Sequence, residues 1–146
     1  MTAAMPSGNR YAYRLPADQA ALDDFLAGLP QHTWYPAAAA AFGEFALKLC
    51  LYEALINALR HGNRGVSRPE ISVTIALQPA EVVITIDDAG PGFPVAARRA
   101  VIAAVPPAES GCGLLLIEHY ADRLNFNPAG NLLTITKQQR PAGSTA

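Results

Sequence analysis

Cysteine is scarce in this 146-residue chain, which contains only Cys50 and Cys112. Two cysteines cannot build a disulfide framework or a cysteine-ligated metal cage, so zinc is not expected. An excess of charge of one sign is also lacking, because 11 basic side chains are balanced by 12 acidic ones. Without a positive field or a dense run of lysines or arginines, we expect no direct binding to nucleic acid.

Long apolar runs are missing as well. No stretch approaches the roughly 20 residues that a membrane-spanning helix needs, and residues 1–10 lack the apolar core of a signal peptide. These absences predict a cytoplasmic protein that has no contact with a membrane. The chain is 51% hydrophobic and long enough for one domain with one core.

Hydrophobic periodicity predicts the elements of the first half. Alternation over residues 10–15 predicts an opening edge strand, and Asp18 can cap a following helix that runs to Leu29. The proline-free stretch 37–60 has apolar residues at helical spacing and predicts the longest helix.

The second half predicts two hairpins separated by a helix. Residues 71–77 and 81–87 alternate between apolar and polar side chains around a Pro-Ala turn. An apolar helix is expected over 114–121, and residues 123–127 and 132–137 form a closing hairpin around a second turn.

This order of elements predicts one domain over residues 10–137, between a flexible N-terminus (1–9) and a disordered tail (138–146). Since most strand neighbours come from hairpins, the helices can all cover one face. We therefore predict an α+β fold, a two-layer sandwich with a mixed, mostly antiparallel sheet. The regular strand–helix alternation of dinucleotide-binding folds is absent.

Three polar residues follow one face of the long helix. Glu53, Asn57 and His61 are spaced four apart, so each step returns to the same side. A carboxylate and an amide one turn apart can serve as a general base and a Mg²⁺ ligand. Taken alone, the same line also fits a solvated helix face.

Two glycine-rich segments follow. Residues 88–92, Asp-Ala-Gly-Pro-Gly, come directly after a strand, where the carboxylate can accept from an amino group and the glycines let backbone lie against a flat ring. They equally fit an ordinary turn. Gly111 and Gly113 open the apolar helix, where free amide groups suit a phosphate, although a surface helix is an alternative. The long spacer 94–110 suits a flap over a ligand.

Together these segments resemble a known family. Residues 53–63, Glu-Ala-Leu-Ile-Asn-Ala-Leu-Arg-His-Gly-Asn, look like the N box of the histidine-kinase-like ATPases, the superfamily of gyrase, heat-shock chaperone, histidine kinase and mismatch-repair ATPases. Residues 88–92 and 111–117 are similar to its two glycine boxes. The short chain and the Glu-Ala-x-x-Asn-Ala-x-x-His form most resemble the bacterial anti-sigma-factor serine kinases.

The resemblance implies a role for each matching position. Asn57 would hold Mg²⁺ against the ATP phosphates, Glu53 would be the catalytic base for the attacking hydroxyl, and Asp88 would recognise adenine. The other implied nucleotide-binding residues are His61, Gly90, Gly92, Gly111, Gly113 and Leu114, and Arg98 and Arg99 of the spacer are further phosphate candidates.

Two positions depart from the family pattern. Cys112 stands between the glycines where relatives often carry a basic or polar residue, and Asn131 stands where many have a threonine near adenine.

The family's fold is the same two-layer sandwich, and its members typically bind ATP with Mg²⁺. They phosphorylate a serine on a small STAS-domain anti-anti-sigma protein and sequester a sigma factor, often as homodimers. Two alternatives stay open, namely a nucleotide-gated binding module without kinase activity and a detached catalytic domain of a sensor histidine kinase. Outside the boxes, Trp34 and Cys50 are expected in the core, while His32 and His119 are expected at the surface or in packing.

Overall fold

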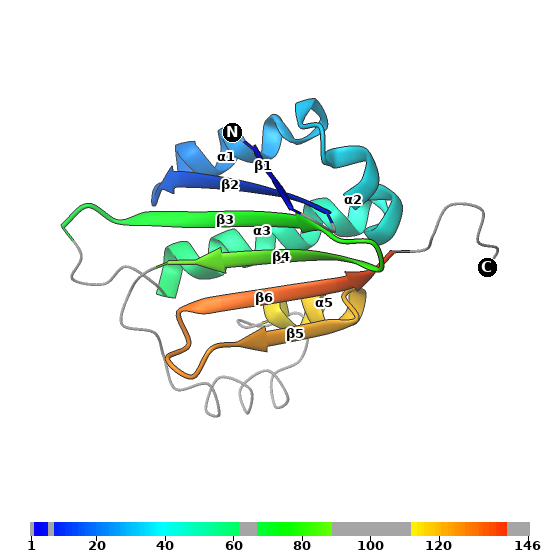
Figure 1. Ribbon diagram of the computed structural model, residues 1–146. Helices are drawn as coiled ribbons and strands as arrows, with labels where there is room; N and C mark the ends of the chain where they lie inside the picture. Colours follow the sequence, from blue (N-terminus) through cyan, green and yellow to red (C-terminus); the bar gives the residue numbers. More distant parts are fainter. Residues whose placement is uncertain (1, 6–7, 62–66, 89–111, 140–146) are drawn as a thin grey trace.

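A layer of helices packs against one face of a six-stranded sheet (Figure 1). The computed structural model describes residues 2–5, 8–61, 67–88 and 112–139. The strands are β1 (Thr2–Met5), β2 (Gly8–Pro16), β3 (Glu70–Leu77), β4 (Glu81–Asp87), β5 (Arg123–Phe126) and β6 (Leu132–Gln138). The helices are α1 (Gln19–Ala27), the short 3-10 helix η1 (Leu29–Gln31), α2 (Tyr35–Phe42), α3 (Glu44–His61) and α5 (Cys112–Tyr120).

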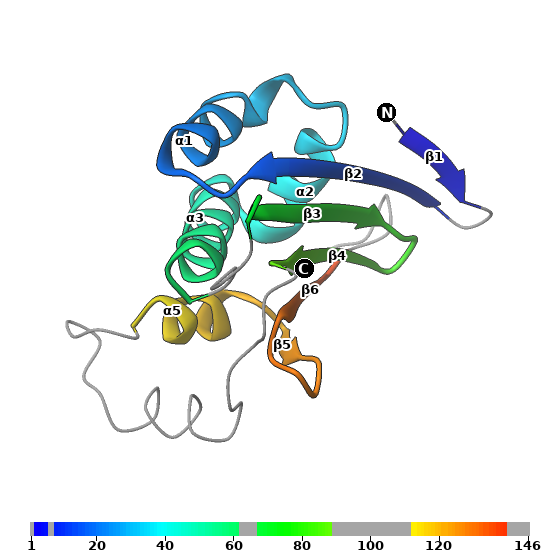
Figure 2. The ribbon, with the colours of Figure 1, turned by 90° about the vertical axis from the view of Figure 1, so that its left-hand side faces the viewer.

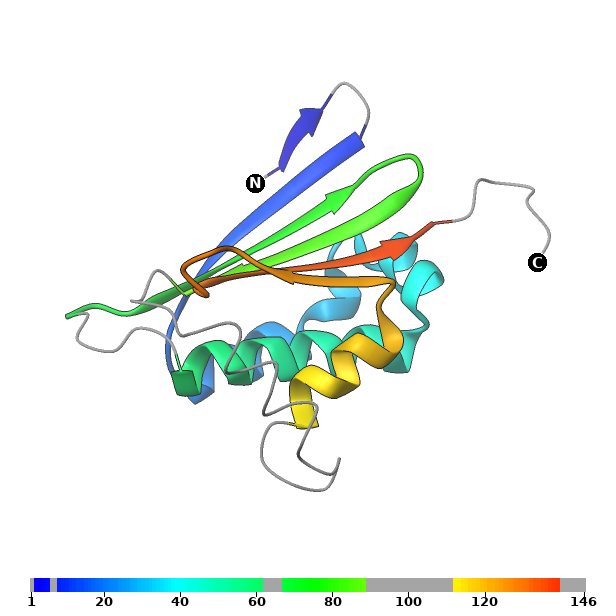
Figure 3. The same ribbon diagram turned by 90° about the horizontal axis from the view of Figure 1, so that it is seen from below.

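The strand order is β1-β2-β3-β4-β6-β5, and every neighbouring pair among these strands is antiparallel. Both predicted hairpins, β3–β4 and β5–β6, are present. The predicted α+β sandwich with helices on one face is confirmed (Figures 2 and 3). A mixed sheet was predicted, whereas the described strands pair only in antiparallel fashion. Between β4 and β6 the chain passes through α5 and β5, and β6 then pairs antiparallel with β4.

The two faces of the sheet differ sharply. On β3, Ile71, Val73 and Ile75 are fully buried against the helices, and the residues between them are only half-buried. On the uncovered face, Thr85 of β4 pairs with Thr74 on one side and with Thr134 on the other. Alternation of this kind places the core between the sheet and the helices.

The N-terminal helices close one side of that core. Asp18 caps α1 as predicted, since its Oδ1 accepts from the amide of Ala21 at 2.8 Å. Trp34 is fully buried and donates its indole N–H to the Tyr13 hydroxyl at 2.8 Å. The His32 ring stacks on Trp34, so the expected core position of Trp34 and the packing role of His32 are confirmed. Cys50 is fully buried, also as expected.

The single helix predicted over 37–60 is wrong, because Gly43 divides it into α2 and α3. Gly43 has φ +90° and ψ 141°, outside the helical region, although its amide still donates to the carbonyl of Ala39 at 2.8 Å. Glycine adopts positive φ without the strain that a Cβ brings. Apolar periodicity continues through this point and conceals the break.

Replacing Gly43 by alanine is expected to lower the free energy of unfolding by about 1–2 kcal/mol. The cause is backbone strain alone, since no atom lies within 4 Å of the position that a Cβ would take. Gly28→Ala is the matched control, because φ is −88° there and the nearest atoms lie at an ordinary 3.5 Å. Urea denaturation measures both variants, and equal stabilities would contradict this explanation of the break.

The expected chain ends also need correction. Residues 1–9 were expected to be flexible, yet β1 pairs with β2 from Thr2↔Tyr11 to Met5↔Gly8, so β2 is not the edge strand. At the other end, β6 continues to Gln138, and Gln139 donates its amide to the carbonyl of Ala80 at 2.8 Å. The rest of the expected tail, 140–146, lies outside the described residues.

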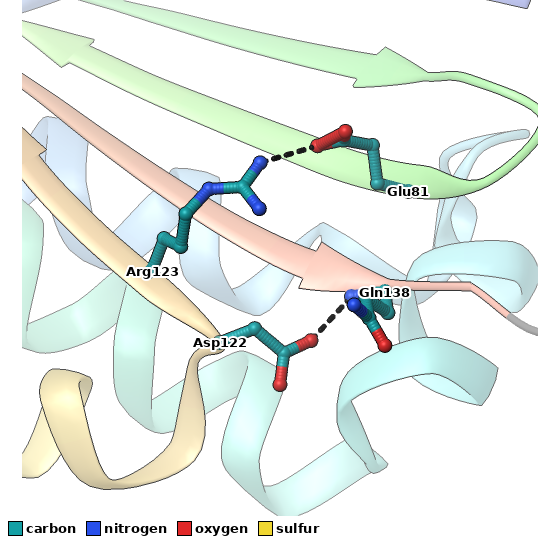
Figure 4. A network of polar contacts seen from close by, with 4 residues as sticks. All are labelled: Glu81, Asp122, Arg123 and Gln138. Carbon is teal, nitrogen blue, oxygen red and sulfur yellow. Dashed lines mark hydrogen bonds and ion pairs between the residues drawn. The ribbon is translucent and has the colours of Figure 1, made fainter.

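Two polar contacts fix the edge formed by β5 and β6 (Figure 4). Arg123 donates to Glu81 at 3.0 Å and so bridges from β5 across β6 to β4. Asp122 accepts from the amide of Gln138 at 2.6 Å. The first contact ties the closing hairpin to β4, and the second joins the start of β5 to the end of β6 within the hairpin. Within the described residues, no helix is both long and apolar enough to cross a bilayer.

Candidate functional site

A small cavity lies between α3, the end of β4 and the turn that joins β5 to β6. It is lined by Ala54, Asn57, Ala58, Ile86, Asp88, Phe126, Gly130, Asn131 and Leu133. Its volume is about 10 Å³, room for about one water molecule. Side chains around it must therefore move before a larger group can enter between these residues.

Asp88 is the charged group of this cavity. It follows β4 directly, and its side chain faces the helices because Ile84 and Ile86 before it on the strand are buried on that side. Only 7% of Asp88 is exposed. Its amide donates to the carbonyl of Asn131 at 3.1 Å, which joins the end of β4 to the start of β6. A carboxylate this buried is costly to retain unless polar groups interact with it.

Asn57 brings a second polar group to the cavity from the opposite layer. The α3 residues before and after it, Ile56 and Ala58, are buried, and Asn57 itself is half-buried. It therefore lies at the boundary between the core and solvent, facing the end of β4. The structure brings Asn57 and Asp88, which are 31 positions apart in the sequence, to the same cavity.

The turn after β5 is organised by Asn127, which the sequence analysis missed. Its Oδ1 accepts from the amides of Gly130, Asn131 and Leu132 at 2.8, 3.0 and 3.1 Å. Its Nδ2 donates to Oδ1 of Asn131 at 2.7 Å. The Asn-Pro pair at 127–128 is a turn-initiating signal that could have identified this residue.

Asn127→Ala is expected to lower the free energy of unfolding by about 1–3 kcal/mol, because buried or half-buried donors lose their acceptor. Asn125→Ala, at an exposed position on β5, is the control. Urea denaturation measures the stability of both variants. Unchanged stability would show that the three amides find other partners.

Glu53 lies one helical turn before Asn57 on α3, against the start of α5. A Cβ built on Gly113 would collide with Oε1 of Glu53 and would lie 3.3 Å from its Cδ. Burial raises the pKa of the Glu53 carboxyl, and the Arg60 guanidinium lowers it by a smaller amount. A carboxyl with a raised pKa holds a proton more tightly than an ordinary glutamate.

The raised pKa of Glu53 predicts a pH-dependent stability. The folded protein binds this proton more tightly than the unfolded chain, so the ionised carboxylate destabilises the fold above the raised pKa. Glu53→Gln should therefore raise the melting temperature at pH 7. The gain should vanish below the ordinary glutamate pKa of about 4.3. Melting curves from pH 4 to 8 test this, and a gain that grows toward acid would contradict it.

The other predicted site residues divide into two groups. Leu114 is described and lies in the core, 2% exposed. His61 ends α3, but its side chain is not among the described ones. The remaining predicted positions, Gly90, Gly92, Arg98, Arg99 and Gly111, lie outside the described residues. In the part of the chain that the structure describes, no group of three or more His, Cys, Asp or Glu residues could hold a metal ion.

Comparison with known proteins identifies a family for this chain. The model of the histidine kinase-like ATPase domain matches residues 13–137. Two anti-sigma F factors of Bacillus licheniformis are each 28% identical to this chain over 97 residues. That alignment covers 62% of this chain and 66% of each relative, just under two thirds of the relatives' length. Because the domain match extends over most of the sequence, the resemblance is confirmed, and the chain belongs to the histidine kinase-like ATPase domain family.

Proposed function

We propose that this protein is an ATP-binding anti-sigma factor with protein serine kinase activity. Its substrate would be a serine on a STAS-domain anti-anti-sigma protein, and it would sequester a sigma factor. The observation that carries the proposal is that Asn57 and Asp88 line one cavity, with Glu53 one turn away along α3. The family match implies a nucleotide site, and the name of the relatives supports the anti-sigma role.

The polar groups of the cavity fit a magnesium nucleotide. The Asp88 carboxylate is buried at a strand end, where it can accept a hydrogen bond from the exocyclic amine of adenine. The Asn57 side chain offers an amide oxygen, a ligand type that Mg²⁺ accepts when phosphates and water complete its shell. When bound, Mg-ATP supplies the γ-phosphoryl group and the cationic charge that neutralises the phosphate oxygens.

Glu53 would act on the attacking group. As the serine oxygen forms its bond to phosphorus and the bond to the ADP oxygen breaks, Glu53 would accept the hydroxyl proton. The raised pKa suits this role, because it makes the carboxylate a better proton acceptor than an exposed glutamate.

The assembly and location belong to the same proposal. The protein would work in the cytoplasm, with a sigma factor and a STAS-domain protein as alternative partners and with a homodimer as the assembly. The near balance of acidic and basic side chains favours action on proteins over direct contact with nucleic acid.

The proposal is tested by incubating the full chain with Mg-ATP and each STAS-domain protein encoded in the same genome. We expect one of them to gain a phosphoserine, detected by intact mass and fragment spectra. A sigma factor should be retained on the immobilised protein, with an affinity that depends on the nucleotide. Tight ATP binding without transfer to any candidate would contradict the kinase activity and indicate a nucleotide-gated binding module. Transfer only to a histidine would indicate a sensor-kinase catalytic domain.

A further inference from the structure

The described glycines differ in the structural reason that favours glycine at each position. Gly43 and Gly130 have φ values of 90° and 81°, a conformation that L side chains rarely adopt. Gly113 does not have a positive φ, and it is the second residue of α5, where alanine has the higher helix propensity. Backbone conformation and helix propensity therefore give no reason for a glycine at position 113.

The reason for glycine at position 113 is the lack of space for a side chain. The three atoms nearest to a Cβ on Gly113 are Oε1, Cδ and Cβ, all from Glu53, and the last two lie at 3.3 and 3.5 Å. By contrast, a Cβ on Gly28 would meet only carbonyl oxygens of its own helix, at 3.5 and 3.8 Å. The Glu53 side chain thus fills the space that a side chain at position 113 would need. Helix α5 packs against α3 here (Figure 3).

A side chain at position 113 would move the carboxylate and leave the helices in place. Oε1 is the far end of a flexible side chain, and Glu53 is only half-buried, so rotation toward solvent is the easiest relief. The two helices also bury core residues, among them Leu55 of α3 and Ile117 of α5, both fully buried. A side chain at position 113 is therefore expected to shift the carboxylate of Glu53 and to affect the fold little.

We propose that Gly113 is a positioning residue for Glu53, keeping open the space in which its carboxylate lies at the start of α5. The family resemblance implies that this glycine contacts phosphate. The packing indicates that it acts indirectly, by leaving space for the carboxylate of Glu53. The inference rests on the proposed function only for the role of Glu53 as base. The steric relation between the two residues stands on the packing alone.

Kinetics of the full chain with Mg-ATP and its STAS-domain substrate test the positioning role. Gly113→Ala should lower kcat at least 10-fold, because a displaced base no longer reaches the hydroxyl, while the Kd for ATP stays within about threefold. In a Glu53→Gln background, the same change should cost less than about twofold, since the positioned group is already gone. Gly28→Ala should leave both constants unchanged. Equal losses in both backgrounds, or a loss confined to ATP affinity, would overturn the proposal.

Thermal unfolding of the unliganded chain tests the steric relation without any activity. Gly113→Ala should raise the melting temperature more in a Glu53→Ala background than in the wild-type chain, because only there does the new methyl group find empty space. Identical shifts in the two backgrounds would overturn the inference even if serine phosphorylation is observed. Non-identical shifts without any phosphorylation would support the packing and reject the proposed kinase function.

Discussion

Glu53→Gln is expected to reduce phosphoserine formation by about 10²–10⁴-fold, the range that a positioned general base contributes. Glutamine keeps the shape of the side chain beside Gly113 but cannot accept the hydroxyl proton. The variant should still bind ATP with a Kd within about threefold of the wild type, because Asn57 and Asp88 are unchanged. Single-turnover transfer to the STAS-domain protein gives the rate, and calorimetry gives the affinity.

A matched control separates this effect from a general loss of negative charge. Glu118 is exposed on α5, on the same helical layer, and Glu118→Gln should transfer phosphate at the wild-type rate. A Glu53→Gln protein that transfers at more than about a tenth of the wild-type rate would reject Glu53 as the base. A protein that loses ATP binding together with transfer would assign Glu53 to the nucleotide site instead.

Asp88→Asn is expected to weaken ATP binding by about 10–100-fold, the cost of losing one charge-assisted hydrogen bond in a buried place. Asparagine fits the same space, so the small cavity beside Asn57 and Asn131 should persist. Calorimetric titration with ATP and with ADP measures the affinity.

The neighbouring residue provides an internal control. Asp87 ends β4 one position earlier, so its side chain points to the uncovered face of the sheet and away from the cavity. Asp87→Asn should bind ATP with wild-type affinity. Equal weakening by both variants would mean that net charge, and not the position of one carboxylate, governs binding. Wild-type affinity in Asp88→Asn would remove Asp88 from the adenine site.

Much of this site could be predicted because its signals are local. Glu53 and Asn57 are one helical turn apart, and helical geometry alone puts them on one side of α3. Asp88 follows a strand whose alternation is clear, so the face of its side chain could be inferred from Ile84 and Ile86. What local patterns do not contain is that these two elements meet, and that statement depended on the resemblance to the family.

The features that were missed depend on tertiary packing or on single backbone angles. Gly43 breaks a helix although the apolar spacing continues through it, because one positive φ leaves no mark in periodicity. The hydrogen bonds of Asn127 form only once the turn between β5 and β6 has closed. The reason for glycine at position 113 lies in a residue 60 positions away.

The sheet separates the helix-covered side of the molecule from its uncovered face. The uncovered face carries Thr74, Thr85 and Thr134, which pair in register. None of the three lines the cavity between β4 and α3. Reporter groups attached at Thr85 would therefore leave the cavity undisturbed, because this residue faces away from it. The two sides can accordingly be re-engineered independently, one for chemistry and the other for attachment.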